Sequence, residues 1–313
     1  MAERVAIVGA GVSGLTCGVV LAERGFHTAI FAKEIGQQTT SGAAAAIWFP
    51  YDAQPAEKVI PWALETYKAL IDLTRDPRTG VSMIDLRQFS RTGEIQIPDW
   101  AIPLGAAAVA TGLRPVFKSG FSLRVPLTDT TIYLDYLAAR LLRAGGTING
   151  EVCFEKLEEV DRDFDPVINC AGIGARELVR DTELEPHRGQ VVIVPRVEDL
   201  SCAIVCDDAP LMYAIPRTND CVFGGTNDLS SDLAADPATT NRIIAECSRV
   251  LNIERPNVLA ARVGLRPFRK SGVRLEREKL RDCRMVIHNY GHGGSGFTLS
   301  WGCAREVLDL ATL

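Results

Sequence analysis

Residues 4–31 have the sequence RVAIVGAGVSGLTCGVVLAERGFHTAIF, in which two short apolar runs flank a glycine turn and a helical stretch. We expect a strand over Arg4–Val8, an amphipathic helix over Leu15–Arg24 and a second strand over His27–Phe31. The turn over residues 9–14 has the spacing Gly-x-Gly-x-x-Gly. A strand, a glycine turn, a helix and a strand in this order are typical of the first unit of a dinucleotide-binding fold.

Each glycine of this turn has a physical reason. Gly9 permits the tight turn, Gly11 lets backbone N–H groups approach a pyrophosphate, and Gly14 lets the helix pack closely on the strand. The free N–H groups at the start of the helix then favour an anion. We therefore expect the whole turn to contact a nucleotide, through Gly9, Ala10, Gly11, Val12, Ser13 and Gly14.

An acidic residue should follow the second strand, where it would bind the ribose hydroxyls. The chain has Lys33 and Glu34 at this place, and Glu34 lies twenty residues after Gly14. We expect Glu34 to be the ribose ligand, with Lys33 beside it. A solvated pair of charges at a strand end is the alternative interpretation.

Composition limits the functions that need to be considered. The chain has 313 residues, with 47% hydrophobic and 23% charged residues, as in an ordinary globular protein. Its net charge of −5 and isoelectric point of about 5.5 argue against nucleic acid or an anionic membrane as a partner. No apolar run is long enough to span a membrane, and the N-terminus has no pattern of a secretory signal. The nine scattered cysteines and four histidines form no metal-ligand pattern, so we expect no metal, reduced thiols and a cytoplasmic location.

The rest of the chain alternates between helical and β-rich stretches. We expect helices over Ala56–Leu73, Thr131–Ala144 (capped by Thr130 or Thr131), Asn241–Leu251 and Gly296–Ala311. We expect strands over Val167–Cys170, Gln190–Val194, Met212–Ile215, Cys221–Phe223, Val258–Arg266 and Arg284–Asn289. Because elements typical of a parallel sheet occur at both ends and in the middle, two discontinuous domains fit this order better than two domains in tandem.

Two further clusters point to a ligand. Residues 39–51, TTSGAAAAIWFPY, contain a run of small residues that could form a helix packed against something flat, or an alanine-rich core helix. Residues 286–298, VIHNYGHGGSGFT, place four glycines between a strand and a helix. A second helix N-terminus would therefore face a ligand, and an anionic flavin fits that place.

The second cluster carries a resemblance. Residues 288–296, HNYGHGGSG, with Trp301-Gly302-x-Ala304, resemble the signature of the D-amino-acid oxidase family, FAD-dependent flavoenzymes that include D-aspartate oxidase. Further motifs occur in the family's order along essentially the whole chain: Trp48-x-Pro50-Tyr51, Asn169-Cys170-Ala171-Gly172, Arg188-Gly189-Gln190, Gly264-Leu265-Arg266-Pro267 and residues 274–278, RLERE.

The resemblance implies a fold and an activity. The fold is α/β (α+β overall), with a Rossmann-like FAD-binding domain over residues 1–50, 130–185 and 265–313, interleaved with a β-rich substrate-binding domain over 51–129 and 186–264. The activity is oxidation of a D-amino acid by hydride transfer to FAD, with O2 as acceptor, giving hydrogen peroxide, a 2-oxo acid and ammonia. No side chain need act as a base. The resemblance also implies a homodimer.

The same resemblance implies roles for single residues. Arg266 matches the arginine that binds the substrate carboxylate, Tyr213 the tyrosine that supports it, and Gly294 the glycine whose carbonyl accepts from the amine. The substrate pocket is expected to include Ile47, Phe49, Tyr51 and Ser295. The FAD contacts beyond the first turn and Lys33–Glu34 are expected at Thr39, Thr40, Ser41, Ala46, Ile47, Gly172, Gly293, Gly294, Ser295, Gly296, Phe297 and Thr298.

Three departures bear on the substrate. The stretch 206–212 is short where animal members carry a lid with a second tyrosine, which has no counterpart here. Asn227 follows Gly-Gly-Thr where members acting on acidic substrates have an arginine, which disfavours D-aspartate. Phe49 favours apolar or bulky side chains. We therefore expect mainly neutral and apolar D-amino acids as substrates.

Other functions remain as alternatives. Within the enzymes, D-aspartate, glycine or sarcosine could be the substrate of the same flavin cradle. A non-catalytic FAD-binding or electron-transferring subunit would not need Arg266 and Tyr213 together, and a nicotinamide-linked dehydrogenase would leave the C-terminal glycine loop without a role. We interpret His288 and His292 as residues that shape this loop. Three arginines nearby are interpreted as structural or as ion-pair partners near FAD: Arg269, Arg274 and Arg277.

Overall fold

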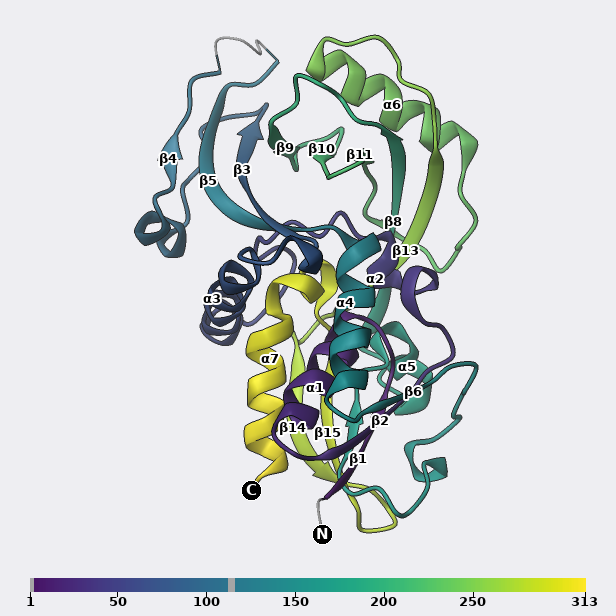
Figure 1. Ribbon diagram of the computed structural model, residues 1–313. Helices are drawn as coiled ribbons and strands as arrows, with labels where there is room; N and C mark the ends of the chain where they lie inside the picture. The colour runs from purple at the N-terminus through teal and green to yellow at the C-terminus, as the bar shows by residue number, and fades with distance from the viewer. Residues whose placement is uncertain (1–2, 112–115) are drawn as a thin grey trace.

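The computed structural model describes residues 3–111 and 116–313, and it contains two β-sheets with helices around them (Figure 1). In the described ranges the first sheet has six strands in the order β14-β15-β7-β1-β2-β6. Their bounds are Arg4–Val8 (β1), His27–Phe31 (β2), Thr147–Asn149 (β6), Val167–Asn169 (β7), Arg274–Lys279 (β14) and Met285–Tyr290 (β15). Both chain termini lie at this end of the molecule (Figure 1).

The second sheet has nine strands among the described residues, in the order β12-β8-β11-β10-β9-β3-β5-β4, with β13 paired to β8. Their bounds are Val81–Ser90 (β3), Ala107–Ala108 (β4), Ser119–Thr128 (β5), Leu184–Pro195 (β8), Cys202–Cys206 (β9), Met212–Pro216 (β10), Asp220–Gly224 (β11), Asp228–Leu229 (β12) and Ala260–Arg269 (β13). Segments from distant parts of the chain thus build each sheet, which confirms the mixed α/β fold.

Helices cover both sheets. The α-helices are Val12–Glu23 (α1), Thr40–Ala43 (α2), Ala56–Leu73 (α3), Thr130–Arg143 (α4), Ala175–Leu178 (α5), Pro237–Leu251 (α6) and Gly296–Ala311 (α7). The short 3-10 turns are Gly36–Gln38 (η1), Pro77–Thr79 (η2), Asp99–Leu104 (η3), Leu157–Glu159 (η4), Gly172–Gly174 (η5) and Gly293–Ser295 (η6). No helix in the described ranges is long and apolar enough to cross a membrane.

The first sheet brings the expected ligand-binding loops to one edge. β1 pairs in parallel with β2 on one side and with β7 on the other, and β7 pairs in parallel with β15. The carboxyl ends of these four strands therefore meet at one edge. There the chain after β1 returns to the first sheet through α1 and β2, while the chain after β7 continues to β8 in the second sheet. Open α/β sheets bind ligands in this crevice.

The first helix differs from the amphipathic pattern expected of it. Nine of the twelve residues of α1 are buried, because α4 and α7 pack against it as well as the sheet. A helix that is covered on several sides can be apolar on all of them.

The second sheet has a covered face and a face toward the first sheet. α6 lies on the outer face (Figure 1), where Ile243 and Cys247 pack in one cluster with Val192, Val194 and Phe223. Side chains on neighbouring positions of a strand point to opposite faces. The residues between these buried ones therefore face the first sheet, where the cavity described below lies.

Two local predictions were wrong. The cap of α4 is Asp129, whose carboxylate accepts a hydrogen bond from the Thr131 backbone N–H at 3.1 Å, and not Thr130 or Thr131. In residues 39–51 only Thr40–Ala43 is helical. The chain then extends along β5, because the Trp48 N–H donates to Pro126 O at 2.9 Å and the extended backbone gains partners there.

Burial of a histidine gives a prediction on stability. His292 is 4% exposed, its Nε2 lies 3.0 Å from Asn289 Oδ1, and burial lowers the pKa of His292 to about 4. In the unfolded chain the imidazole takes up a proton near pH 6.5, whereas in the native state it does so only near pH 4. The free energy of unfolding therefore falls by on the order of 3 kcal/mol as the pH is lowered from about 6.5 toward 4. Denaturant unfolding between pH 7 and 4.5 measures the loss.

The matched variant is His292→Gln, which keeps a hydrogen-bonding group and removes the titration. Its free energy of unfolding should fall less over the same pH range than that of the wild type. An equal pH dependence in both proteins would contradict the assignment of this loss to His292.

Candidate active site

A cavity of about 1090 Å³ lies between the two sheets. It begins at the loops after β1, β2, β7 and β15 and ends against the second sheet, among side chains of β3, β9, β10 and β13. One continuous space therefore joins the expected nucleotide-binding loops to the expected substrate-binding residues.

Two glycines of the turn after β1, Gly9 and Gly14, leave no room for a side chain. Gly9 has a φ of +110°, and a Cβ there would lie 2.3 Å from Cys170 O. A Cβ on Gly14 would lie 1.9 Å from Gly9 O, so α1 could not begin against the turn. These contacts bring Gly11, Val12 and Ser13 to the cavity wall at the start of α1. The Val12 N–H donates to Ser41 Oγ at 2.9 Å, and the other N–H groups of this helix end favour an anionic group.

The segment after β2 forms the far end of the cavity. Lys33 and Glu34 both line it, and both are exposed. The chain from Val152 to Lys156 lies opposite, held by a hydrogen bond from the Val152 N–H to Ala32 O at 3.0 Å. Residues 152–156 were not predicted to line a site, because the composition of this segment is not typical of a ligand-binding loop.

The C-terminal glycine loop packs against the segment that carries Phe49 and Tyr51. A Cβ on Gly293 would lie 2.2 Å from Asp52 O, and one on Gly294 would lie 2.7 Å from Tyr51 Cδ1. The Thr298 hydroxyl accepts from the Phe49 N–H at 3.1 Å and donates to Phe49 O at 3.0 Å. The start of α7 therefore fixes the backbone of this segment, and Phe49 and Tyr51 line the cavity.

Ser295 lies elsewhere than expected. It is fully buried and does not line the cavity. Its hydroxyl accepts from the Tyr51 N–H at 2.8 Å and donates to Tyr51 O. Ser295 thus acts on the pocket through Tyr51, because the turn of η6 points its side chain away from the cavity.

Arg266 lies flat against a glycine. A Cβ on Gly189 would lie 2.5 to 2.6 Å from Nη1, Cζ and Nη2 of Arg266, so the guanidinium covers this position of β8. Its Nη1 donates to Thr226 O at 2.9 Å and to Asn227 Oδ1 at 3.3 Å. Arg266 forms no ion pair with a carboxylate in the part of the chain that the structure describes. A half-buried arginine with neutral partners, in a cavity, can bind an anionic ligand through its remaining donors.

Tyr213 lies beside Arg266 and is positioned in the same way. A Cβ on Gly224 would lie 1.9 Å from Cζ of Tyr213, so the ring covers Gly224. Burial raises the pKa of Tyr213, while the Arg266 charge partly opposes this. Burial, with the charges of Asp207 and Asp52, also raises the pKa of Tyr51 to about 12. Both hydroxyls therefore keep their protons at neutral pH and can donate hydrogen bonds into the cavity.

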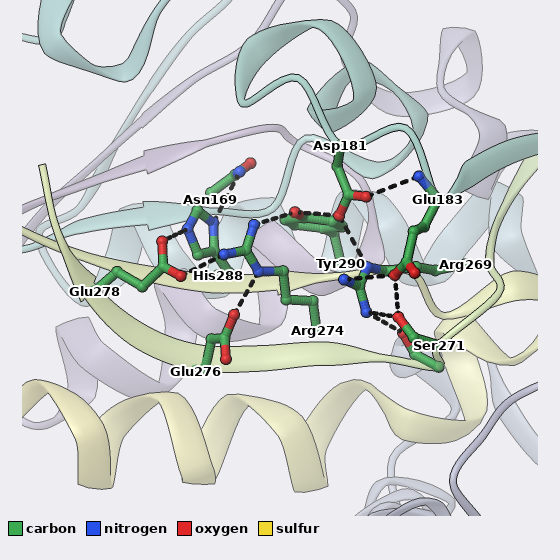
Figure 2. A network of polar contacts seen from close by, with 11 residues as sticks. Asn169, Asp181, Glu183, Arg269, Ser271, Arg274, Glu276, Glu278, His288 and Tyr290 are labelled. Carbon is green, nitrogen blue, oxygen red and sulfur yellow. Dashed lines mark hydrogen bonds and ion pairs between the residues drawn. The ribbon is translucent and has the colours of Figure 1, made fainter.

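A buried polar network supports the strands behind this site (Figure 2). Arg274 donates to the Tyr290 hydroxyl at 2.8 Å, which donates to Asp181 at 2.8 Å, and Arg269 donates to the same carboxylate at 2.8 Å. Although burial raises the pKa of Asp181, the bonds from Arg269 and Tyr290 hold it below its usual range. The network thus ties the end of β13, the strand of Arg266, to β14 and β15.

His288 belongs to the same network. Its Nδ1 lies 3.2 Å from Asn169 Nδ2 and its Nε2 lies 3.3 Å from Glu278 (Figure 2). Burial and the Arg274 charge lower the pKa of His288 to about 4. His288, Arg269 and Arg274 do not line the cavity, in agreement with the structural interpretation of all three.

The cavity contains nearly all the residues expected to contact FAD or substrate. Among the expected residues, Gly14 and Ser295 lie outside it, both within close backbone packing. The sequence analysis missed polar wall residues on other elements: Gln88, Glu177, Arg180, Asp207 and Asn289. No group of three or more histidine, cysteine or acidic side chains that could hold a metal occurs in the described ranges.

Comparisons with known proteins agree with this arrangement. The profile of the DAO family, described as FAD dependent oxidoreductase, matches residues 4–310. A D-amino-acid oxidase of Rubrobacter xylanophilus is 41% identical over 98% of this chain and 95% of its own. A D-amino-acid oxidase of Streptomyces coelicolor is 37% identical over 98% of this chain and 96% of its own. A human D-aspartate oxidase is 31% identical over 99% of this chain and 94% of its own.

Solved structures show the same fold at lower identity. The glycine oxidase from Geobacillus kaustophilus matches with a TM-score of 0.85 at 19% identity, over 99% of this chain and 95% of that one. The family profile and the full-length relatives agree with the glycine turn, the cavity and the second sheet. The chain therefore belongs to the DAO family of FAD-dependent oxidoreductases.

Proposed function

We propose that the protein is a D-amino-acid oxidase that converts mainly neutral and apolar D-amino acids into 2-oxo acid, ammonia and hydrogen peroxide. Its 41% and 37% identical relatives are both named D-amino-acid oxidase. The observation that carries the proposal is Arg266, a cation without a carboxylate partner in a cavity continuous with the glycine turns. An amino-acid carboxylate supplies the missing anion.

The cavity walls fit FAD. The α1 N-terminus, the segment from Thr39 to Ala46 and the start of α7 line one continuous space, and Cβ atoms at Gly9 or Gly293 could not be accommodated. Gly11, Val12 and Ser13 would hold the pyrophosphate, and Glu34 with Lys33 the adenosine ribose. FAD, when bound, accepts a hydride from the substrate and passes the electrons to O2. The first sheet with its helices would form the FAD-binding domain over 1–50, 130–185 and 265–313, and the second sheet the substrate domain over 51–129 and 186–264.

Arg266 and Tyr213 would orient the substrate. A bidentate pair between the guanidinium and the carboxylate fixes one end of a small molecule in both position and direction. The Tyr213 hydroxyl, kept protonated, donates a second hydrogen bond to the same carboxylate. The Gly294 carbonyl would accept from the amine, opposite Tyr51. No general base is required of these residues, since a neutral amine can itself push electrons as the Cα–H bond breaks.

The pocket walls support neutral side chains and leave two alternatives. Ile47, Phe49, Leu86, Val205 and Ile215 line the cavity with apolar surface. A D-aspartate oxidase would need a cation for the second carboxylate, and Asn227 stands where the resemblance places that arginine. A glycine- or sarcosine-type oxidase would leave this apolar surface without a partner.

A location and an oligomeric state belong to the same proposal. Seven of the nine cysteines are buried, as expected of a protein in the reducing cytoplasm. We infer a homodimer from the resemblance.

Anaerobic mixing tests the proposed activity. The FAD-loaded protein is mixed with single D- and L-amino acids, glycine and sarcosine, and the flavin absorbance is followed. Neutral D-isomers should bleach the flavin, and their L-isomers should not. Bleaching by D-aspartate, glycine or sarcosine alone would replace the proposal by one of its alternatives, and no bleaching by any amine would contradict an amine oxidase.

The first prediction from the proposed function concerns Arg266→Ala. Because removing one partner of a desolvated charge pair costs about 3–5 kcal/mol, kcat/KM for D-alanine should fall by at least about 100-fold. Steady-state peroxide formation measures this, and the flavin spectrum checks that FAD remains bound. Unchanged kinetics would remove Arg266 from the substrate site.

The second prediction concerns the contact beneath Arg266. In Gly189→Ala the new Cβ would lie 2.5 Å from Nη1, so the guanidinium must move. We expect KM for D-alanine to rise by roughly tenfold while FAD stays bound. The matched control is Gly93→Ala, because a Cβ on Gly93 meets nothing within 4 Å. Equal kinetics of both variants would show that this contact does not position Arg266.

The third prediction concerns FAD. A Cβ on Gly11 would already lie 3.1 Å from Ser41 Oγ, which accepts from the Val12 N–H at 2.9 Å. Gly11→Val should therefore give a folded but colourless protein whose melting temperature does not rise with added FAD. A yellow variant that FAD stabilises as it does the wild type would contradict the assignment of this turn.

A further inference from the structure

The end of the pocket carries a polar pair within otherwise apolar walls. Gln88 and Asp207 both line the cavity, next to Leu86, Val205 and Leu211. The Gln88 side-chain amide donates to Asp207 Oδ2 at 2.7 Å. Gln88 is 6% exposed, so a buried amide holds the orientation of the carboxylate.

Strand register places this pair on the same face as Tyr213. Gln88 on β3 is opposite Val205 on β9, Val205 is opposite Tyr213 on β10, and Tyr213 is opposite Gly224 on β11. Directly paired residues share one face of a sheet, and so do residues two apart on an extended chain. Asp207, two residues beyond Val205, therefore continues this face past the end of β9.

Asp207 has no cationic partner. Among the described residues no arginine, lysine or histidine forms an ion pair with it, and its hydrogen bond from Gln88 uses one of its two oxygens. The side chain is exposed into the cavity, whose walls partly desolvate the carboxylate and raise the pKa of Asp207. Its charge also raises the pKa of Tyr51, which places the two groups near each other.

Among the described residues, Arg266 is thus a cation without an anionic partner and Asp207 an anion without a cationic one, and both line the cavity. A ligand with a carboxylate at one end and a cation at the other would pair both charges. Val205 lies between Gln88 and Tyr213 in the strand register, Leu86 lines the same cavity, and their apolar surface suits the methylene groups of such a ligand.

We propose that Asp207, positioned by Gln88, selects D-amino acids whose side chain ends in a cation over neutral ones with the same carbon skeleton, and disfavours acidic ones. This inference rests on the proposed oxidase function. It extends the neutral and apolar preference, because the apolar walls still accept short neutral side chains that do not reach Asp207.

Pairs of substrates with the same carbon skeleton, one member cationic and one neutral, test it. The FAD-loaded wild type is assayed with D-lysine against D-norleucine and with D-arginine against D-citrulline, at a pH where both side-chain cations are charged. We expect kcat/KM to favour the cationic member by about tenfold or more. In Asp207→Asn, which keeps the size and a hydrogen-bonding oxygen, this ratio should fall toward one.

Asp85→Asn is the matched control. Asp85 lies on β3 like Gln88, but its carboxylate is exposed and pairs with Arg124 at 3.3 Å on the outside. The substitution removes the same charge without touching the cavity, so the D-lysine to D-norleucine ratio should equal that of the wild type. A similar fall in both variants would assign the effect to net charge and overturn the role of Asp207.

The outcomes separate the two proposals. Wild type that oxidises D-norleucine but prefers neither cationic substrate overturns the role of Asp207 and leaves the oxidase function intact. If the wild type oxidises no D-amino acid, the proposed oxidase function itself is contradicted. Because the wild-type ratio is decisive alone, the test stands even if Asp207→Asn does not fold.

Discussion

The stacking of the Arg266 guanidinium on Gly189 is the contact on which the site depends. It places a positive charge at the cavity wall with two neutral acceptors, Thr226 O and Asn227 Oδ1, and without a carboxylate. Half-burying an arginine without an anion costs free energy, which a bound carboxylate returns. In the proposed oxidase, Arg266 would therefore supply both binding energy and orientation of the substrate, as transfer of a hydride from one defined Cα requires.

The rest of the fold holds this contact in place relative to FAD. β13 carries Arg266 in the second sheet, while its last residue, Arg269, is bonded to Asp181 and through it to Tyr290 in the first sheet. Thr298 and Ser295 fix the segment of Phe49 and Tyr51 against α7 from the opposite side. Both walls of the proposed substrate pocket are thereby tied to the glycine loop that follows β15, so the proposed pocket and the proposed FAD-binding residues form one unit.

Periodicity and glycine spacing predict four of the six strands that the first sheet has in the described ranges, because the units from Arg4 to Phe31 and from Met285 to Ala311 are local, while β6 and β14 were not predicted. Helices α3 and α7 have the bounds expected of them. β3 and β5 were missed, although the buried Phe121, Leu123, Val125 and Leu127 alternate as in a half-buried strand, and their pairing, from Val81 with Thr128 to Ser90 with Ser119, cannot be read from either segment alone. The same reason hid Gln88 and Asp207, which become neighbours only through the parallel pairing of β3 with β9. Ser295 was misplaced because its spacing in the motif does not reveal that η6 turns it toward Tyr51.

The most direct test is a crystal structure of the FAD-loaded protein with 6-aminohexanoate, which has the carboxylate and the side-chain cation of D-lysine but no α-amine to oxidise. We expect both carboxylate oxygens of the ligand at about 2.7–2.9 Å from donors of Arg266. Its chain should be directed between Leu86 and Val205 toward Asp207. A carboxylate bound away from Arg266, or a chain directed out of the cavity, would contradict this expectation.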